Sequence, residues 1–243
     1  ASNTAVGKSA LAANTTAANN TAVGTSALGA NTTGASNTAV GMSALAANTT
    51  ATRNVALGRG AGEANTTASN ITAVGYHALN ANTTGADNTA IGQNALDVNT
   101  TGSQCVAVGV DALGAQVSGA HYNVAVGHSA LKASTTASGN TAIGFQALTA
   151  NTTGHSNVAV GGGSLAAATS STNNSVAIGY NAGTGMTTGS TNTIVGALAG
   201  DAVMTGSGNC LFGTSAGGEI TSGANCVAVG LNALDANTTG SSN

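Results

Sequence analysis

The 243-residue chain has no proline and no tryptophan, and it has only two phenylalanines and three tyrosines. This shortage of bulky side chains excludes a conventional globular core built on aromatic packing. Charged residues make up 5% of the chain, far below the roughly 25% of an average globular domain. The net charge is −3, with four Lys plus Arg. Since so few cations cannot neutralise a phosphate backbone, we expect no nucleic-acid partner.

Long apolar runs and clustered reactive groups are also missing. No stretch approaches the roughly 20 apolar residues of a membrane helix, so we expect no membrane insertion by this segment. The carboxylates are dispersed, and the four histidines share no position in the pattern described below; they are His77, His121, His128 and His155. Without a nucleophile, base or ligand set at a useful spacing, the sequence predicts no catalytic residue, no metal, no cofactor and no enzymatic activity.

A short repeat fills the chain instead. "NTTGASNTAVG" at 31–41 returns as "NTTGADNTAIG" at 82–92 and "NTTGHSNVAVG" at 151–161. We call the glycine that closes each copy the anchor glycine. Eleven of the thirteen intervals between anchors are 17 residues and two are 18, and the chain ends in the phase in which it begins. We therefore expect residues 1–243 to form a single repeat array, a window from a longer periodic chain. The anchors are Gly7, Gly24, Gly41, Gly58, Gly75, Gly92, Gly109, Gly127, Gly144, Gly161, Gly179, Gly196, Gly213 and Gly230.

The residues before each anchor predict a short strand. Val, Ile or Leu precedes the glycine in thirteen copies, Thr or Val stands two residues earlier in thirteen, and Ala lies between them in twelve. β-Branched residues at i and i+2 are typical of a strand. We expect the Val column to face the core and the Ala column to face outward. The outward Ala stripe would be covered by another copy of the chain, which predicts a homo-oligomer.

The segment after the anchor, such as "SALAAN", has helical propensity and offers a strand-plus-helix alternative. Such repeats need at least about 20 residues, so 17 residues favour the other fold. The sequence thus predicts an all-β protein, a parallel β-solenoid (β-roll) of about fourteen 17-residue coils, laterally associated in a homo-oligomer.

Two polar columns predict hydrogen-bonded ladders along the stack. Asn stands four residues before the anchor in ten copies, interrupted by Ile71, Cys105, Ser175 and Cys226. The ninth residue after the anchor is Thr or Ser in all copies. The threonines of this expected hydroxyl ladder are Thr16, Thr33, Thr50, Thr67, Thr84, Thr101, Thr136, Thr153, Thr188, Thr205 and Thr239.

The residue directly after the anchor varies most, and it includes Arg59, Tyr76, Phe145 and Tyr180. We regard these four as a candidate ligand-contact ridge, against the alternative that a solvent-facing column simply drifts. Cys105, Cys210 and Cys226 are expected to be small hydrophobic thiols, with an interchain bond as the alternative.

Several copies resemble a known family. "SVAIGYNA" at 175–182, "NTAIGFQA" at 140–147 and "NVAVGHSA" at 123–130 are similar to the head repeat of the YadA-like trimeric autotransporter adhesins, although that repeat is shorter and lacks the inserted "NTT". The longer arrays also resemble repetitive stalks of bacterial and phage tail-fibre-like proteins. The resemblance implies a left-handed β-roll, three chains side by side, and a bacterial surface.

We therefore expect a structural fibre of an extracellular appendage, the shaft or head of an adhesin that attaches to host, prey or surface receptors. Its partners would be copies of itself, with a trimer favoured. One alternative is an ice-binding β-solenoid, because a flat Thr array orders water, although no T-x-T pair recurs. Another is a self-assembling sheath or matrix filament without a specific ligand.

Overall fold

A computed structural model describes residues 2–243, and no residue in that range is helical. The chain divides into two units, Ala1–Tyr122 and Asn123–Asn243, which are described separately. The first unit contains β1 (Thr4–Val6), β2 (Thr21–Val23), β3 (Thr38–Val40), β4 (Val55–Leu57), β5 (Thr72–Val74), β6 (Thr89–Ile91) and β7 (Val106–Val108). The second contains β8 (Val124–Val126), β9 (Thr141–Ile143), β10 (Val158–Val160), β11 (Val176–Ile178), β12 (Thr193–Val195), β13 (Cys210–Phe212) and β14 (Val227–Val229).

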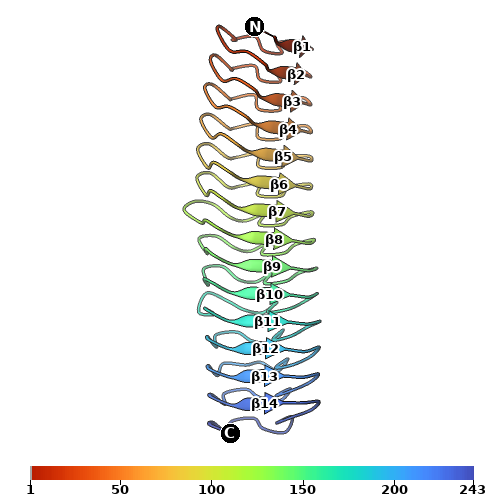
Figure 1. Ribbon diagram of the computed structural model, residues 1–243, viewed down its shortest axis with the longest axis vertical. Helices are drawn as coiled ribbons and strands as arrows, with labels where there is room; N and C mark the ends of the chain where they lie inside the picture. Colours follow the sequence, from red (N-terminus) through yellow and green to blue (C-terminus); the bar gives the residue numbers. More distant parts are fainter. Residues whose placement is uncertain (1) are drawn as a thin grey trace. The chain divides into compact units, whose positions relative to one another are not determined.

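Within each unit every strand pairs in parallel with the next strand in the chain (Figure 1). The register follows the repeat, so that Thr21 pairs with Thr38 and Val23 with Val40. Each 17-residue copy is therefore one coil of a parallel β-solenoid. The predicted all-β fold, its parallel stacking and its strand position are confirmed.

The anchor glycine is required by the close approach of successive coils. Gly75 has a φ of +135°, which L side chains rarely adopt, and a Cβ added there would lie 2.6 Å from the carbonyl oxygen of Gly92. The other anchors have φ values between +121° and +141°. A side chain would therefore push two neighbouring coils apart.

The predicted assignment of the two strand faces is wrong. The central alanine of each complete interior coil is buried, as Ala22, Ala39 and Ala73 show with no exposed surface. Its neighbours point outward, and Val40 keeps 38% of its surface exposed. The physical reason is the width of the coil. Where the interior holds a leucine and two asparagines, only a methyl group fits from the strand side. Ile194 and Leu211 take this central position, fully buried, beside coils in which glycine replaces the leucine.

The leucine four residues after the anchor fills the rest of the core, and it does so in the left-handed backbone region. Leu45, for example, is fully buried at a φ of +50°. Four coils have glycine in this column at similar φ values, namely Gly62, Gly183, Gly200 and Gly217.

A larger side chain from another column enters the space beside these glycines. A Cβ built on Gly62 would lie 3.5 Å from Cδ1 of Ile71. A Cβ on Gly183 would lie 3.1 Å from Cδ1 of Ile194, and one on Gly217 would lie 2.8 Å from Cδ2 of Leu211. A glycine in the leucine column is therefore compensated by a larger side chain in another column, so that the total volume of core side chains stays similar from coil to coil.

The predicted asparagine ladder is confirmed, and it lies in the core. The backbone N–H of Asn37 donates to Oδ1 of Asn20 at 2.8 Å, and that of Asn54 donates to Oδ1 of Asn37 at 3.0 Å. Each side-chain amide also donates along the stack, as Asn37 does to the carbonyl of Ala51 at 2.9 Å. These buried amides are satisfied on both sides, which removes the cost of burying them.

A second amide ladder runs through the first asparagine of "NTT" in the first unit. Nδ2 of Asn48 donates to Oδ1 of Asn31 at 2.8 Å, and Nδ2 of Asn65 donates to Oδ1 of Asn48 at 3.0 Å. In the second unit Asn151 and Asn237 remain in this column, whereas Ala168, Met186 and Ile220 replace the amide in other coils with apolar side chains.

The hydroxyl ladder lies one residue before the predicted column. The eighth residue after the anchor carries it: Oγ1 of Thr32 donates to the carbonyl of Thr49 at 3.1 Å, and Oγ1 of Thr66 to that of Thr83 at 3.0 Å. The ninth residue is exposed in most coils, as at Thr33 and Thr67. The backbone bends at this pair, so in most coils only the first hydroxyl reaches the next coil. Three residues of the predicted column also reach it. Oγ1 of Thr101 accepts from the N–H of Gly119 at 3.3 Å, and Thr153 and Thr205 donate to carbonyls at 3.4 and 3.3 Å.

Candidate functional site

The outward surface of the strands is the most regular surface in each unit. In the first unit it consists of two side chains per strand, at the first and third strand positions, and we call it the first strand face. Five of its seven strands place Thr at the first position. The residues are Thr4, Val6, Thr21, Val23, Thr38, Val40, Val55, Leu57, Thr72, Val74, Thr89, Ile91, Val106 and Val108.

The corresponding surface of the second unit, the second strand face, is more apolar. Only two of its seven strands place Thr at the first position. Phe212 and Ile178 on this face are 56% and 41% exposed. Its residues are Val124, Val126, Thr141, Ile143, Val158, Val160, Val176, Ile178, Thr193, Val195, Cys210, Phe212, Val227 and Val229.

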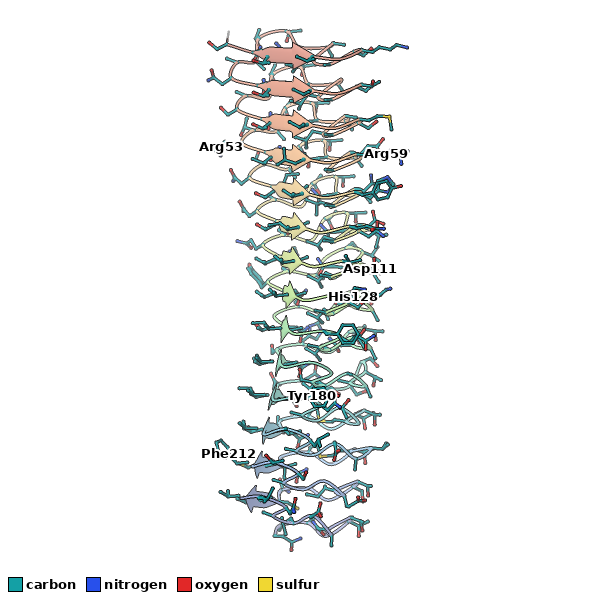
Figure 2. All side chains as sticks on the ribbon, turned by 90° about the vertical axis from the view of Figure 1, so that its right-hand side faces the viewer. Arg53, Arg59, Asp111, His128, Tyr180 and Phe212 are labelled. Carbon is teal, nitrogen blue, oxygen red and sulfur yellow. The ribbon has the colours of Figure 1, made fainter. Side chains whose placement is uncertain are left out.

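Neither strand face contains a charged side chain. The charges lie on other columns, and none of them is buried. Figure 2 shows Arg53 and Arg59 on opposite sides of the strands of the first unit, with Asp111 on the same side as Arg59. Each unit therefore has one continuous charge-free surface bordered by polar columns.

The structure places the four predicted ridge residues at the surface, two in each unit. Nη1 of Arg59 donates to the hydroxyl of Tyr76 at 3.1 Å, and its guanidinium lies 5.5 Å from the centre of that ring. The ring of Tyr76 also stacks on His77 at 4.0 Å. In the first unit, Arg59 and Tyr76 thus form one exposed cluster.

In the second unit, Phe145 stacks on the ring of His128 at 5.7 Å. Tyr180 lies two coils further on and is 64% exposed (Figure 2). The structure gives no ring contact between Phe145 and Tyr180. These two residues share a column, but they do not form a joint site.

A polar cluster on the turns of the first unit surrounds Asp97. Burial raises the pKa of the Asp97 carboxyl above its ordinary value, the nearby charge of His77 lowers it, and that of Asp111 raises it further. On neighbouring coils, Nδ2 of Asn80 donates to Oε2 of Glu63 at 3.2 Å. No group of three or more His, Cys, Asp and Glu gathers as a metal-ligand set within residues 2–243.

The three cysteines lie on two different faces. Cys105 and Cys226 occupy the buried asparagine column, and their backbone N–H groups continue the ladder by donating to Oδ1 of Asn88 and of Asn209. Cys210 lies on the second strand face and is exposed. Cys105 and Cys226 therefore act as small core side chains, as predicted, whereas the thiol of Cys210 is open to solvent.

The described part of the chain, residues 2–243, encloses no pocket. It also contains no helix long and apolar enough to span a bilayer. Sequence reasoning missed the two strand faces because it assigned their side chains to the core. The sequence does contain a signal for these faces. Alanine occupies twelve of the fourteen central strand positions, which indicates that this position has room for only a small side chain and therefore points into the coil.

No family model, no curated protein and no solved structure matches the chain.

Proposed function

We propose that the chain is a structural fibre segment of an extracellular appendage, the shaft or head of an adhesin. The observation that carries this proposal is the set of axial ladders. Backbone pairing, two buried asparagine columns and a threonine column all bond one coil to the next. A unit held together in this way resists local unfolding along its axis, because each coil is bonded on both sides.

Association of copies supports the same role, and the second strand face is the surface that favours it. Ile143, Ile178 and Phe212 leave large apolar areas in water. Contiguous exposed apolar surface of this kind marks an interaction site. A copy of the chain is the simplest partner, since its own strand face has the same charge-free, in-register columns. A left-handed coil and a trimer, implied by the resemblance to YadA-like adhesins, belong to this proposal.

The oligomeric state of the chain tests the proposed association between copies. We expect sedimentation of the chain to give a species heavier than one chain. The double variant Ile143→Lys/Ile178→Lys should sediment as a monomer, because two charges per chain would then have to be buried. The matched control Thr136→Lys/Ser170→Lys adds the same charges at exposed turn positions of nearby coils and should associate like the unmodified chain. A monomeric unmodified chain at all concentrations would remove lateral association from the account.

Attachment to host, prey or surface receptors is the second part of the proposal, with Arg59, Tyr76, Phe145 and Tyr180 as contact residues. These four have the exposed aromatic and guanidinium groups that are enriched at binding hot spots. Replacing all four by Ser should reduce binding of the chain to its target cells. Equal binding before and after the change would leave the ridge without a role.

A further inference from the structure

The first strand face differs from an ordinary apolar patch in its hydroxyl groups. None of Thr4, Thr21, Thr38, Thr72 and Thr89 uses its hydroxyl in a hydrogen bond within the described residues 2–243. The turn threonines, by contrast, donate theirs to the next coil, as Thr32 does. The five strand hydroxyls therefore face water with their bonding capacity free.

The strands hold these groups in a regular two-dimensional array. Successive strands pair without a shift in register from β1 to β7. Parallel strands lie about 4.8 Å apart, and side chains at i and i+2 lie about 6.6 Å apart along each strand. The face therefore repeats methyl and hydroxyl groups at two short, fixed spacings, and the axial one is close to the repeat distance within a layer of hexagonal ice.

The composition of the face suits ordered water better than it suits a protein partner. Methyl groups of Thr, Val and Ile restrict the orientation of the water next to them, while the free hydroxyls bond to it. Val55 and Val106 interrupt the Thr column with a side chain of the same shape, so the outline of the column is unchanged at these two coils. It carries no charge that would bind water in an orientation incompatible with a lattice.

We propose that the first strand face binds the surface of an ice crystal. The ligand is water in its crystalline lattice, held by rows of methyl groups and anchored by the threonine hydroxyls. This inference goes beyond the proposed fibre function and uses a different surface from the one proposed for lateral association. The first and third strand positions form the T-x-V pair on one face that sequence reasoning overlooked when it searched for T-x-T.

The exposed threonines of the turns provide a matched comparison. Thr33 and Thr67 are as regular in sequence as the strand threonines, but they lie outside any strand. Backbone hydrogen bonds such as that from Thr33 to the carbonyl of Thr49 fix the spacing of the turns along the stack, but no strand places a second outward side chain two residues further along the chain. Ice binding should therefore depend on the strand threonines and not on these.

The experiment measures thermal hysteresis and the shape of a single ice crystal in solutions of the full chain. We expect the chain to hold the crystal below its melting point and to facet it. The variant Thr38→Lys/Thr72→Lys should lose both effects, and the control Thr33→Lys/Thr67→Lys should keep them. Circular dichroism and melting confirm folding of each variant. If the double variant fails to fold, the single variant Thr72→Lys takes its place.

An unmodified chain without hysteresis or faceting overturns the inference, and so do strand and turn variants that behave alike. Sedimentation of the same samples separates this result from the fibre proposal. A chain that associates but leaves ice unaffected retains the proposed function and loses the ice-binding face. A monomeric chain that shapes ice retains the ice-binding face and loses the proposed lateral association.

Discussion

Conservation of core volume between coils makes a sharp prediction at Gly62 and Ile71. Neighbouring coils place leucine where Gly62 lies and asparagine where Ile71 lies, as Leu45 and Asn54 do one coil earlier. Gly62 has a φ of +58°, close to the +50° of Leu45, so its backbone already accepts a leucine. Space is the obstacle. A new Cβ would already lie 3.1 Å from Cδ2 of Leu45 and in contact with Cδ1 of Ile71 at 3.5 Å, which leaves no room for the other carbons of a leucine side chain.

Each single substitution should therefore lower the free energy of unfolding, and the double substitution should not. Ile71→Asn removes a buried aliphatic side chain, which costs about 2–5 kcal/mol of unfolding free energy by analogy with other large-to-small core changes. Gly62→Leu overfills the coil and costs about 1–3 kcal/mol. Together they restore the pattern of the neighbouring coils, with leucine filling the core and the introduced asparagine joining the ladder. We expect the double variant to lie within about 1 kcal/mol of the unmodified chain, a coupling of more than about 2 kcal/mol.

Urea unfolding followed by circular dichroism measures the three variants beside the unmodified chain. The midpoint should fall for each single variant and return for the double variant. Additive losses in the double variant would refute the idea that volume is exchanged between the two columns. The variant Thr50→Ala, at an exposed position of the preceding coil, should leave the midpoint unchanged and serves as the control.

Three further substitutions test the ladder, the anchor glycine and the Asp97 carboxyl. Asn54→Ala should lower the free energy of unfolding by about 1–3 kcal/mol, since it leaves the buried N–H of Ile71 without its acceptor; an unchanged urea midpoint would contradict the ladder. Gly75→Ala should lower the free energy of unfolding by about 1–3 kcal/mol through backbone strain. The control Gly29→Ala, at a position where other coils have alanine, should leave the free energy of unfolding unchanged. Equal melting temperatures of the two variants would refute the role of the anchor glycine. Because burial raises the pKa of Asp97 above 3.8, the folded chain binds more protons than the unfolded chain between 3.8 and the raised value, and stability falls as the pH rises through that window. Asp97→Asn should therefore raise the melting temperature at neutral pH but not below a pH of 3.8, and a gain that is the same at both pH values would exclude titration of Asp97 as its cause.

Much of the fold follows from periodicity alone. A fixed 17-residue spacing with β-branched residues before each glycine predicts one strand per coil in parallel stacking, and the strand bounds agree with it. The asparagine ladder also follows from the sequence, because an amide repeated at one position bonds to its copy in the next coil. These features are local or periodic, so the pattern of one repeat predicts the structure of the others.

The sequence did not predict which strand face points inward. Alternation shows that neighbouring side chains lie on opposite faces, but it does not say which face is buried. Valine is more often buried than exposed in proteins, and that general preference gave the wrong answer here. The deciding fact is the narrowness of the coil, which depends on Leu45 and the asparagines packing against the strand from the opposite side. The compensation between Gly62 and Ile71 was equally hidden, since the two residues belong to different columns. The candidate surfaces were missed for the same reason.

The reactivity of the native cysteines tests the face assignment most directly. Cys210 lies in an outward strand column, while Cys105 and Cys226 lie in the buried asparagine column. We propose labelling the folded chain with a maleimide, at a concentration at which it is monomeric, and mapping the products by mass spectrometry. Cys210 should react within minutes and the other two only in urea. Labelling of Cys105 and Cys226 in the folded chain, with Cys210 protected, would show that the strands face the other way.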